Sequence, residues 1–496
     1  MKQKTSHLWV ATALSALTLT AGLAACSDDD TPQTAERTWT TDGGLRATND
    51  ILFDNNTLGN GDKELVLKGS QTLKKGTYTL KGWIYVADGS VLTIEPGTVI
   101  RGDKQTKSAI IVEKGGKIFA QGTAQAPIVF TSGEPKGQRK PGDWGGIILC
   151  GKSLNNANDQ QIEGGPRSHH GGSDPADNSG VLSYVRIEYA GYPFETDKEI
   201  NGLTLGSVGS GTTIDHVQVS YSNDDSFEWF GGTVNCKYLV AFNGWDDEFD
   251  TDNGFSGNVQ FALSVRDPRI ADKSQSNGFE SDNDAGGTTA APYTSATFSN
   301  VTFIGPKAVA TDFVNDPTYI NGGDAFPNNG SGLGKFQAAM HIRRGSRLNC
   351  LNSVAVGWPI GLIIDGEKGD TPQQAAQGGF RLKNLWFADM DITGSDANKS
   401  YTDTKDDGTY PSRSTELFLA WGNNVVTSAA LKLTGAGNFT GLRANYLPAA
   451  DSPLCTAADF TDAGNWFEKV GYAGAFGATG NWLTGWTNFD PNNTDY

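Results

Sequence analysis

The feature of this sequence that most constrains its fold is a short strand unit that recurs along the chain. Each unit has a small polar residue or Asn, then alternating apolar residues, then a polar turn. Val217, Leu239 and Phe261 lie in three successive units and are spaced 22 residues apart. A period near 22 with short strands in each period is typical of a β-solenoid, whose coils bury their apolar faces against one another.

Composition favours strands and tight turns over helices. The chain has 63 Gly, which suits coils that turn sharply, because a tight corner calls for a positive φ. Apolar runs separated by turns continue through 91–100, 110–112, 117–120 and 128–131. Long helical patterns are missing, so the sequence predicts an all-β chain.

The first 25 residues predict an export signal rather than part of the fold. Lys2 and Lys4 make a positive start, and an apolar stretch over 8–25 runs directly into Cys26. The four residues 23–26, Leu-Ala-Ala-Cys, resemble a bacterial lipobox. That resemblance implies a lipoprotein signal peptide over 1–25 and an acylated Cys26, carrying palmitate or a similar chain, as the membrane anchor. The alternative is an ordinary anchor or secretory signal with a Cys by chance.

An acidic segment at 28–30 directly follows Cys26. It resembles the export signal of Bacteroidetes surface lipoproteins, which implies attachment to outer-membrane lipid with the protein facing the cell exterior. A solvated acidic tether in the periplasm is the alternative. Residues 26–45 are polar, so we expect a flexible, lipid-anchored tether there.

Longer stretches resemble one family. Residues 82–132 look like the opening coils of bacterial right-handed parallel β-helix proteins, and GDWGGIILCGK, LSYVRIEYAGY, DDSFEWFGGTV and DDEFDTDNGFSG continue the likeness. The set is similar to β-helix surface lipoproteins and secreted proteins common in Bacteroidetes, which have no settled activity. The resemblance implies an all-β, right-handed parallel β-helix of pectate-lyase-like architecture, with terminal caps and loop insertions.

We expect three parts after the tether. An N-terminal cap covers 46–80, because an open coil would present unpaired backbone edges. The parallel β-helix covers 81–415, with long loops near 305–340 and 389–415 that are rich in polar and turn-forming residues. The last coils and a C-terminal cap cover 416–496.

An acidic pattern repeats in the middle of the chain. Asp-Asp-Ser-Phe-Glu at 224–228 recurs 22 residues later as Asp-Asp-Glu-Phe-Asp, and Gly-Phe-Glu at 278–280 follows after 30 more. If these segments stack, three Phe side chains form an inward column and the acids form outward columns. The inward column is Phe227, Phe249 and Phe279; the outward columns are Glu228, Asp250 and Glu280, and then Asp252 and Asp282.

Carboxylates on neighbouring coils lie about 4.8 Å apart along the stack, so they repel unless a cation, a donor or a proton intervenes. One interpretation is a solvated acidic surface that salt screens. A second is a Ca²⁺ site, because Ca²⁺ takes six to eight oxygen ligands. The candidate ligands are Asp246, Asp250, Asp252, Asn253 and Asp282.

A third interpretation is polysaccharide cleavage. A glycosidase would use a pair of carboxyl groups from Glu228, Asp250 and Glu280. A lyase would combine Ca²⁺ with a base that removes a proton from the sugar ring. The candidate bases are Arg266, Lys273, His216 and Arg343, and none lies in a diagnostic motif.

Aromatic residues lie beside the acidic turns. Tyr221, Trp229 and Trp245 could stack on sugar rings through their apolar faces, or pack into the corners of coils. Four cysteines remain after Cys26, and their spacing selects no disulfide pattern and fits no zinc motif. They are Cys150, Cys236, Cys350 and Cys455.

The charge balance excludes one class of partner. The formal net charge is −17 and no basic block is present, so we expect no nucleic-acid binding. The sequence therefore predicts a cell-surface lipoprotein that binds an extracellular glycan or similar polymer, with Ca²⁺ as a candidate stabilising ion. A polysaccharide-degrading enzyme and a structural or adhesive surface rod are the alternatives. Nothing in the sequence indicates the oligomeric state.

Overall fold

The computed structural model describes residues 36–61, 63–162, 165, 167–195, 198–435 and 445–496. The chain divides into two compact units, Met1–Arg37 and Thr38–Tyr496, and the second contains every strand and helix of the described residues. The predicted signal peptide, Cys26 and the first part of the tether lie outside the described residues. No described helix is long and apolar enough to cross a membrane.

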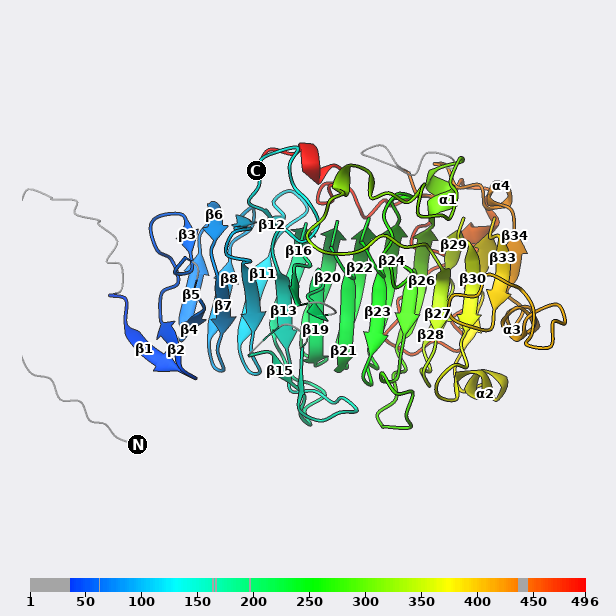
Figure 1. The fold of residues 1–496 in the computed structure, drawn as a ribbon, viewed down its shortest axis with the longest axis horizontal. Helices are drawn as coiled ribbons and strands as arrows, with labels where there is room; N and C mark the ends of the chain where they lie inside the picture. Colours follow the sequence, from blue (N-terminus) through cyan, green and yellow to red (C-terminus); the bar gives the residue numbers. More distant parts are fainter. Residues whose placement is uncertain (1–35, 62, 163–164, 166, 196–197, 436–444) are drawn as a thin grey trace, which may run out of the picture. The chain divides into compact units, whose positions relative to one another are not determined.

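The second unit is a stack of coils that contribute strands to two large sheets (Figure 1). Neighbouring strands of the first sheet pair in parallel, except for the antiparallel pair β1–β2. Its 13 described strands follow one another in chain order. They are β1 (Trp39–Asp42), β2 (Leu45–Thr48), β4 (Leu65–Leu67), β7 (Trp83–Val86), β10 (Ala109–Val112), β13 (Gly146–Cys150), β19 (Leu203–Val208), β21 (Phe227–Gly232), β23 (Phe249–Asp252), β25 (Phe279–Ser281), β27 (Ala338–Ile342), β30 (Ile360–Ile364) and β33 (Ile392–Ser395).

The second sheet is parallel throughout its described strands and wraps the rest of each coil. Early coils give it two short strands each, the middle coils give it one long strand each, and the last coils again give two short strands. Thus β11 and β12 both pair with β16, and β26 pairs with both β28 and β29. Its strands are β3 (Thr57–Leu58), β5 (Ser70–Leu73), β6 (Thr77–Leu80), β8 (Val91–Ile94), β9 (Val99–Gly102), β11 (Lys117–Gln121), β12 (Ile128–Ser132), β16 (Gly180–Glu188), β20 (Thr213–Ser220), β22 (Asn235–Phe242), β24 (Asn258–Val265), β26 (Thr297–Ile304), β28 (Asn349–Leu351), β29 (Val354–Val356), β31 (Leu382–Lys383), β32 (Trp386–Ala388) and β34 (Asn424–Val426).

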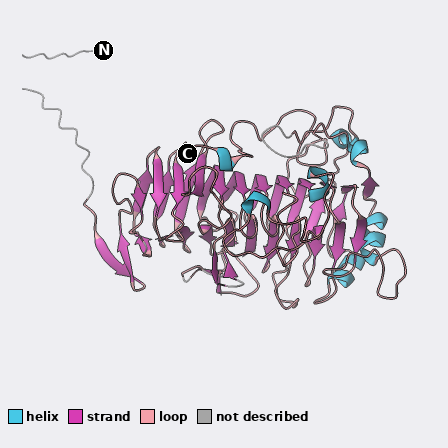
Figure 2. Ribbon diagram, turned by 45° about the horizontal axis from the view of Figure 1, so that its top comes forward, coloured by secondary structure: helices cyan, strands magenta, loops and turns pink. Residues whose placement is uncertain are grey.

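Helices and small hairpins are confined to the connections, as Figure 2 shows. The helices are α1 (Pro306–Val309), α2 (Thr371–Ala376), α3 (Arg413–Ala420) and α4 (Ser428–Leu431), with short 3₁₀ turns at Gly323–Ala325, Pro453–Thr456 and Pro491–Asn493. The hairpins pair β14 (Gln160–Gln161) with β15 (His169–His170) and β17 (Pro193–Glu195) with β18 (Lys198–Glu199). The prediction of an all-β, right-handed parallel β-helix with loop insertions is confirmed.

Each long strand of the second sheet bends at one residue with a positive φ. Tyr184, His216, Tyr238 and Phe261 have φ of 50°, 54°, 57° and 60°. The left-handed conformation costs such residues about 1–2 kcal/mol each. Their rings stack in a column with centroids 4.3, 4.3 and 5.1 Å apart, and aromatic contacts of this kind return about 0.5–1.5 kcal/mol. Aromatic stacking therefore takes the place of the glycines expected at these corners.

The interior is a continuous apolar core. Phe227, Phe249 and Phe279 are fully buried, and their ring centroids lie 5.7 and 6.0 Å apart along the stack. The inward Phe column is therefore confirmed. The four described cysteines are free thiols; Cys150, Cys236 and Cys350 are buried in the core, and Cys455 is half-buried.

The structure moves the boundaries expected at the N-terminal end. The segment 46–80, expected to be a cap, already forms coils, because β2 pairs in parallel with β4, and β4 with β7. The antiparallel strand β1 covers the outer edge of β2, and it lies inside the segment 26–45 that was expected to be a flexible tether.

The C-terminal segment also differs from expectation. Residues 457–496, here called the strap, form no further coils but run back along the second sheet towards the early coils (Figure 1). Side-chain amides of successive coils donate to strap carbonyls. These bonds are Asn384–Ala457 (2.6 Å), Asn352–Asp459 (3.0 Å), Asn300–Tyr472 (2.8 Å) and Gln218–Asn488 (2.8 Å).

Candidate functional site

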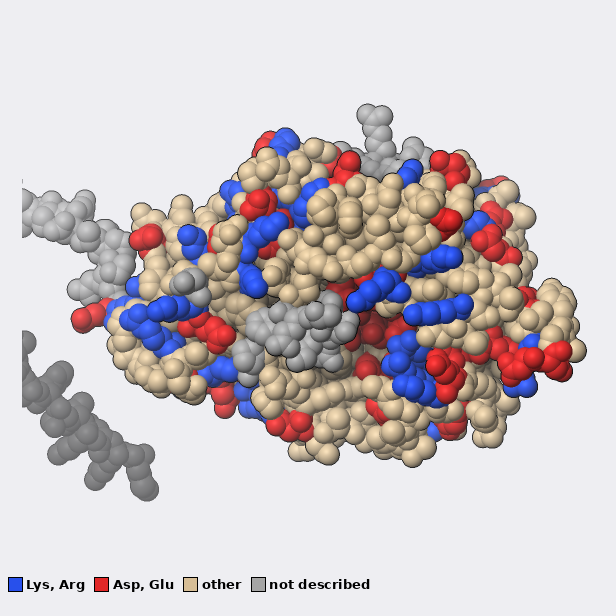
Figure 3. Space-filling view, in the orientation of Figure 1, with Lys and Arg blue, Asp and Glu red and all other residues tan. Residues whose placement is uncertain are grey.

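The acidic repeat forms the ladder that its spacing predicted. Parallel pairing of β21, β23 and β25 sets Glu228 beside Asp250 and Asp250 beside Glu280. Strand side chains alternate between the two faces of a sheet, so these three point outward while the neighbouring Phe residues point inward. Figure 3 shows acidic residues on the floor of a hollow on this face, with Lys and Arg around its rim.

The turns that precede these strands bring further carboxylates to the ladder. Three overlapping groups each offer one oxygen per residue, and within a group these oxygens lie within 4.8 Å of one another. Asp225 belongs to two groups and Asp250 to two, so the groups form one continuous cluster. The groups are Asp224, Asp225 and Asp246; Asp225, Glu228 and Asp250; and Asp247, Asp250 and Glu280.

Several of these carboxylates are short of donors. Oδ1 of Asp246 and Oδ1 of Asp250 are buried and have no hydrogen-bond partner. Two other carboxylates of the cluster have backbone donors. Asp225 accepts a hydrogen bond from the backbone N–H of Asp247 (2.8 Å), and Asp247 accepts one from the backbone N–H of Asn277. The cluster thus contains two enclosed carboxyl oxygens that accept no hydrogen bond from the described residues.

The protonation of the cluster reflects this imbalance. Burial first, and then neighbouring carboxylates, raise the pKa of Asp225, Asp247 and Asp250 well above the ordinary value. The same causes raise the pKa of Asp246 to about 8 and that of Asp252 to about 7. Without a cation, the cluster therefore holds protons at neutral pH.

The next coil of the sheet supplies positive charge. Arg343 donates to Asp282 (2.8 Å) and also pairs with Glu280, and Arg344 donates to Asp282 (2.7 Å). Burial alone would raise the pKa of Glu280, but Arg343 and His341 outweigh it and lower this pKa to about 2. Glu280 is therefore ionised while its neighbour Asp250 favours the protonated form.

His341 and Arg344 were not among the residues that the sequence singled out. His341 lies opposite Glu280 in the register of β25 and β27, and its Nε2 is 3.3 Å from Oδ2 of Asp365. The two strands are separated by a long insertion, so the 22-residue period gives no signal at β27. The alternation within β27 would have placed His341 outward once its register was known.

The structure separates the predicted Ca²⁺ ligands into two sets. Asp246 and Asp250 belong to the carboxylate cluster, whereas Asp252 and Asp282 belong to none of its three groups. The side-chain oxygen of Asn253 accepts a hydrogen bond from Gln160. Asp282 is already balanced by two guanidinium groups.

Two of the candidate bases have structural roles instead. Arg266 is fully buried, pairs with Glu248 (2.9 Å) and donates to the backbone oxygen of Asp246 (2.6 Å). His216 lies on the second sheet, within the column of stacked rings. Lys273 is exposed on the loop before β25, and Arg343 lies at the ladder.

The proposed sugar-stacking tryptophans are corrected by their burial. Trp229 and Trp245 are both 0 % exposed, so neither ring presents a face to a ligand. Trp229 packs in the core against Phe255, and Trp245 donates its indole N–H to the backbone oxygen of Gly332 (3.1 Å). Tyr221 is half-buried and lies away from the ladder, where it stacks on Tyr189.

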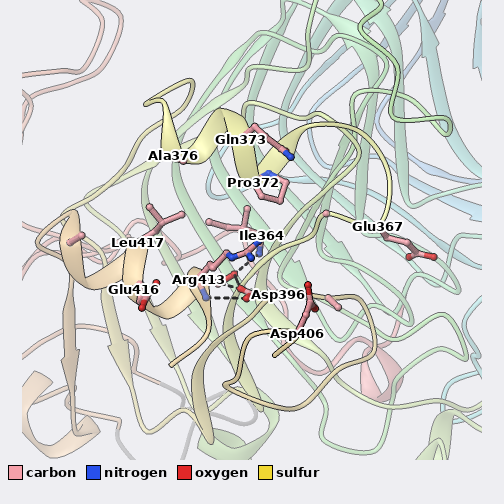
Figure 4. Close-up of a pocket in the computed structure, with 14 residues that line it drawn as sticks. Ile364, Glu367, Pro372, Gln373, Ala376, Asp396, Asp406, Arg413, Glu416 and Leu417 are labelled. Carbon is pink, nitrogen blue, oxygen red and sulfur yellow. Dashed lines mark hydrogen bonds between the residues drawn. The ribbon is translucent and has the colours of Figure 1, made fainter. Parts of the chain in front are cut away.

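A cavity of about 640 Å³ lies near the end of the stack, between α2 and α3 (Figure 4). Ile364, Pro372 and Leu417 give it an apolar side. The carboxylate of Asp396 accepts backbone N–H bonds from Arg413 (3.0 Å) and Ser414 (2.9 Å), so it fixes the start of α3. No ladder residue lines this cavity.

Comparison with known proteins identifies one family. Residues 65–438 match the family described as "Pectate-lyase like beta helix domain". One similar solved structure is the crystal structure of pectate lyase Pel9A. The match covers 84% of this chain and 88% of the pectate lyase chain, with 12% sequence identity and a TM-score of 0.34. Another is the crystal structure of the Dettilon tailspike protein. That match covers 74% of this chain and 62% of the tailspike chain, with 8% sequence identity and a TM-score of 0.26. Among curated proteins none matches.

Proposed function

Because the chain belongs to the family of pectate-lyase-like β-helix domains, we propose that it binds an extracellular polysaccharide along the outer face of its first sheet. The carboxylate cluster on β21, β23 and β25 holds Ca²⁺ in this proposal. Cys26 anchors the protein in the outer membrane through its acyl chain, and the β-helix faces the cell exterior.

The observation that carries the proposal is the pair of buried, unpartnered oxygens on Asp246 and Asp250. Leaving such oxygens without a partner is costly, and a divalent cation bound by the group to which each belongs removes the cost. The donor set fits Ca²⁺, which prefers carboxylate oxygens at about 2.3–2.6 Å. Within each group of the cluster the three oxygens lie within 4.8 Å of one another, close enough for one ion to contact all three.

Binding is favoured over β-elimination by the state of Arg343. A lyase needs a group that can take a proton from the sugar ring. Although burial would lower the pKa of Arg343, Glu280 and Asp282 raise it, so this guanidinium stays charged. Its place beside the cluster suits a carboxylate or hydroxyl group of a bound polymer instead.

A second candidate function, glycoside hydrolysis, is favoured by one observation. Asp250 and Glu280 are neighbours in the ladder, and their environments shift their pKa values in opposite directions. A protonated acid beside an ionised carboxylate is the pairing that glycosidases use. The two functions exclude each other at Asp250, because a residue that ligates Ca²⁺ has lost its proton.

One experiment separates the two functions. The purified protein is titrated with a panel of acidic and neutral polysaccharides, in Ca²⁺ and in EDTA, and each mixture is assayed for new reducing ends. We expect Ca²⁺-dependent binding without cleavage, and its loss in Asp250→Asn. Asp88→Asn, which changes an exposed carboxylate outside the cluster, is the matched control and keeps binding. Cleavage that Ca²⁺ suppresses would instead support the hydrolase.

The anchor is tested separately. Expression in a Gram-negative host should place the protein in the outer-membrane fraction, where protease added to intact cells degrades it. Cys26→Ser should release it from that fraction. Protection from external protease would place the protein on the periplasmic side instead. If the protein shows no Ca²⁺ dependence, binds no polymer and cleaves none, the remaining function is that of a structural or adhesive surface rod.

A further inference from the structure

Another cavity, lined mainly by polar residues, lies where β16, β20 and β22 end, beneath the strap. It consists of two adjoining hollows of about 570 and 390 Å³ that share Tyr221, Asp267, Arg269 and Asp490. We call it the strap cavity. None of the acidic ladder residues lines it.

The strap cavity is richer in acceptors than in free donors. Asp267 and Asp490 line both hollows, and two further carboxylates line one hollow each. Its two guanidinium groups are partly used by the protein: Arg139 donates to the backbone oxygen of Pro491 (2.5 Å), and Arg269 to that of Tyr319 (3.2 Å). An anionic ligand would meet more negative than positive charge here.

Two polar atoms of the cavity lining have no partner within the described protein. Tyr189 is 2 % exposed and its hydroxyl makes no hydrogen bond, and the side-chain oxygen of Asn492 is also buried and unpartnered. Both residues line the smaller hollow. A buried polar group without a partner is destabilising, so two in one cavity point to a bound polar molecule.

The wall of the cavity is rigid. The rings of Tyr189 and Tyr221 stack with centroids 5.4 Å apart and an angle of 10° between their planes. Phe242 packs edge-on against Tyr221 at 5.7 Å. Both tyrosines directly follow long strands, and both have positive φ, so the stacked coils fix their positions. Preorganised aromatic walls with polar groups around them suit sugars.

We propose that the strap cavity is a second carbohydrate site, which takes one neutral sugar unit. A sugar carries several hydroxyl donors for the carboxylates and for Asn492, and hydroxyl oxygens that can accept from Tyr189. The inference rests on the proposed function only in that the ligand is a carbohydrate. Binding here needs no Ca²⁺, because none of the three carboxylate groups found among the described residues includes a residue that lines this cavity.

The test uses saturation-transfer NMR with glucose, galactose, mannose and xylose as probes, each added to the Ca²⁺-free protein. We expect transfer to at least one of these sugars. Tyr189→Phe should weaken its binding about fivefold, the worth of one neutral hydrogen bond. Ala325→Trp, which fills the smaller hollow, should abolish binding.

The controls distinguish a ligand contact from a structural one. Removing an unpartnered hydroxyl should leave the thermal stability of Tyr189→Phe unchanged or higher. Tyr184→Phe removes a hydroxyl from the neighbouring column of rings outside the cavity, and should bind sugar normally. Asp250→Asn should also bind normally, so failure of the ladder site leaves this result intact. The proposal is overturned if none of the four sugars binds, or if binding survives Ala325→Trp.

Discussion

Binding of Ca²⁺ to the acidic ladder should release protons, and the structure sets their number. Metal ligands must be deprotonated, so a carboxyl group that holds a proton gives it up when the ion binds. With a pKa of about 8, Asp246 is about nine-tenths protonated at pH 7, and Asp250 also favours its protonated form. Because these groups interact, we expect about one to two protons per Ca²⁺ rather than a full proton from each.

Isothermal titration calorimetry measures this number directly. Ca²⁺ is titrated at pH 7 in two buffers with different ionisation enthalpies, and the difference in heat gives the protons released. Asp246→Asn should reduce the release by about one proton, and raising the pH to about 9.5 should remove the share that Asp246 contributes. Ca²⁺ binding without proton release at pH 7 would refute the coupling between burial, carboxylate repulsion and the ion.

Four further predictions concern stability. Without Ca²⁺, the free energy of unfolding should fall as the pH rises from 5 to 8. The reason is that the pKa of Asp246 is raised in the folded protein, so over this pH range Asp246 holds fewer protons in the unfolded chain than in the folded one. A free energy of unfolding that rises with pH in urea titrations would contradict this. In urea titrations with EDTA, Asp250→Asn should have a higher free energy of unfolding than wild type, and Ca²⁺ should not raise it further. A lower free energy of unfolding than wild type would contradict the claim that the buried Asp250 carboxyl group is destabilising without Ca²⁺. Glu248→Gln should lower the free energy of unfolding by about 3–5 kcal/mol with or without Ca²⁺, since it leaves the buried Arg266 unpaired; a change under about 1 kcal/mol would argue against that pair. Asn352→Ala should cost about 1–3 kcal/mol and speed proteolysis of the strap, because Asn352 exchanges two hydrogen bonds with Asp459; an unchanged proteolysis rate would show that the strap does not depend on them.

The central part of the fold could be predicted from local pattern alone. The 22-residue spacing between Phe227 and Phe249 fixes the register of two coils, and strand alternation then places Glu228 and Asp250 outward. The same alternation places Trp229 inward, because it lies two residues after Phe227. The sugar-stacking interpretation of Trp229 overlooked this constraint, and the alternative, a ring packed inside the coil, is what the structure shows.

Other features depend on contacts between segments that are distant in the sequence. The strap reaches Asn300 and Asn352 through side-chain amides, which leave no periodic signal in the strap itself. Arg343 comes to the ladder only after the insertion between β25 and β27. The raised pKa of Asp250 depends on burial and on carboxylates that other coils bring beside it, Glu280 and Asp282. The site chemistry was therefore less predictable than the fold.

The burial of Arg266 shows why residue type alone misleads. An arginine near a row of acids suggests a surface charge or a catalytic base. The structure places it beneath the ladder, where Glu248 and backbone carbonyls take its donors. Its guanidinium supports the turn that carries Asp246, so it positions the cluster without facing a ligand.

The most direct test of the account is equilibrium binding of the purified protein to the polysaccharide panel, with Ca²⁺ and with EDTA, for wild type and Asp250→Asn. We expect wild type to bind at least one polysaccharide in Ca²⁺, and we expect EDTA and the substitution each to abolish this binding. Polysaccharide binding that persists in EDTA and in Asp250→Asn would contradict the assignment of the acidic ladder as a Ca²⁺-dependent binding surface.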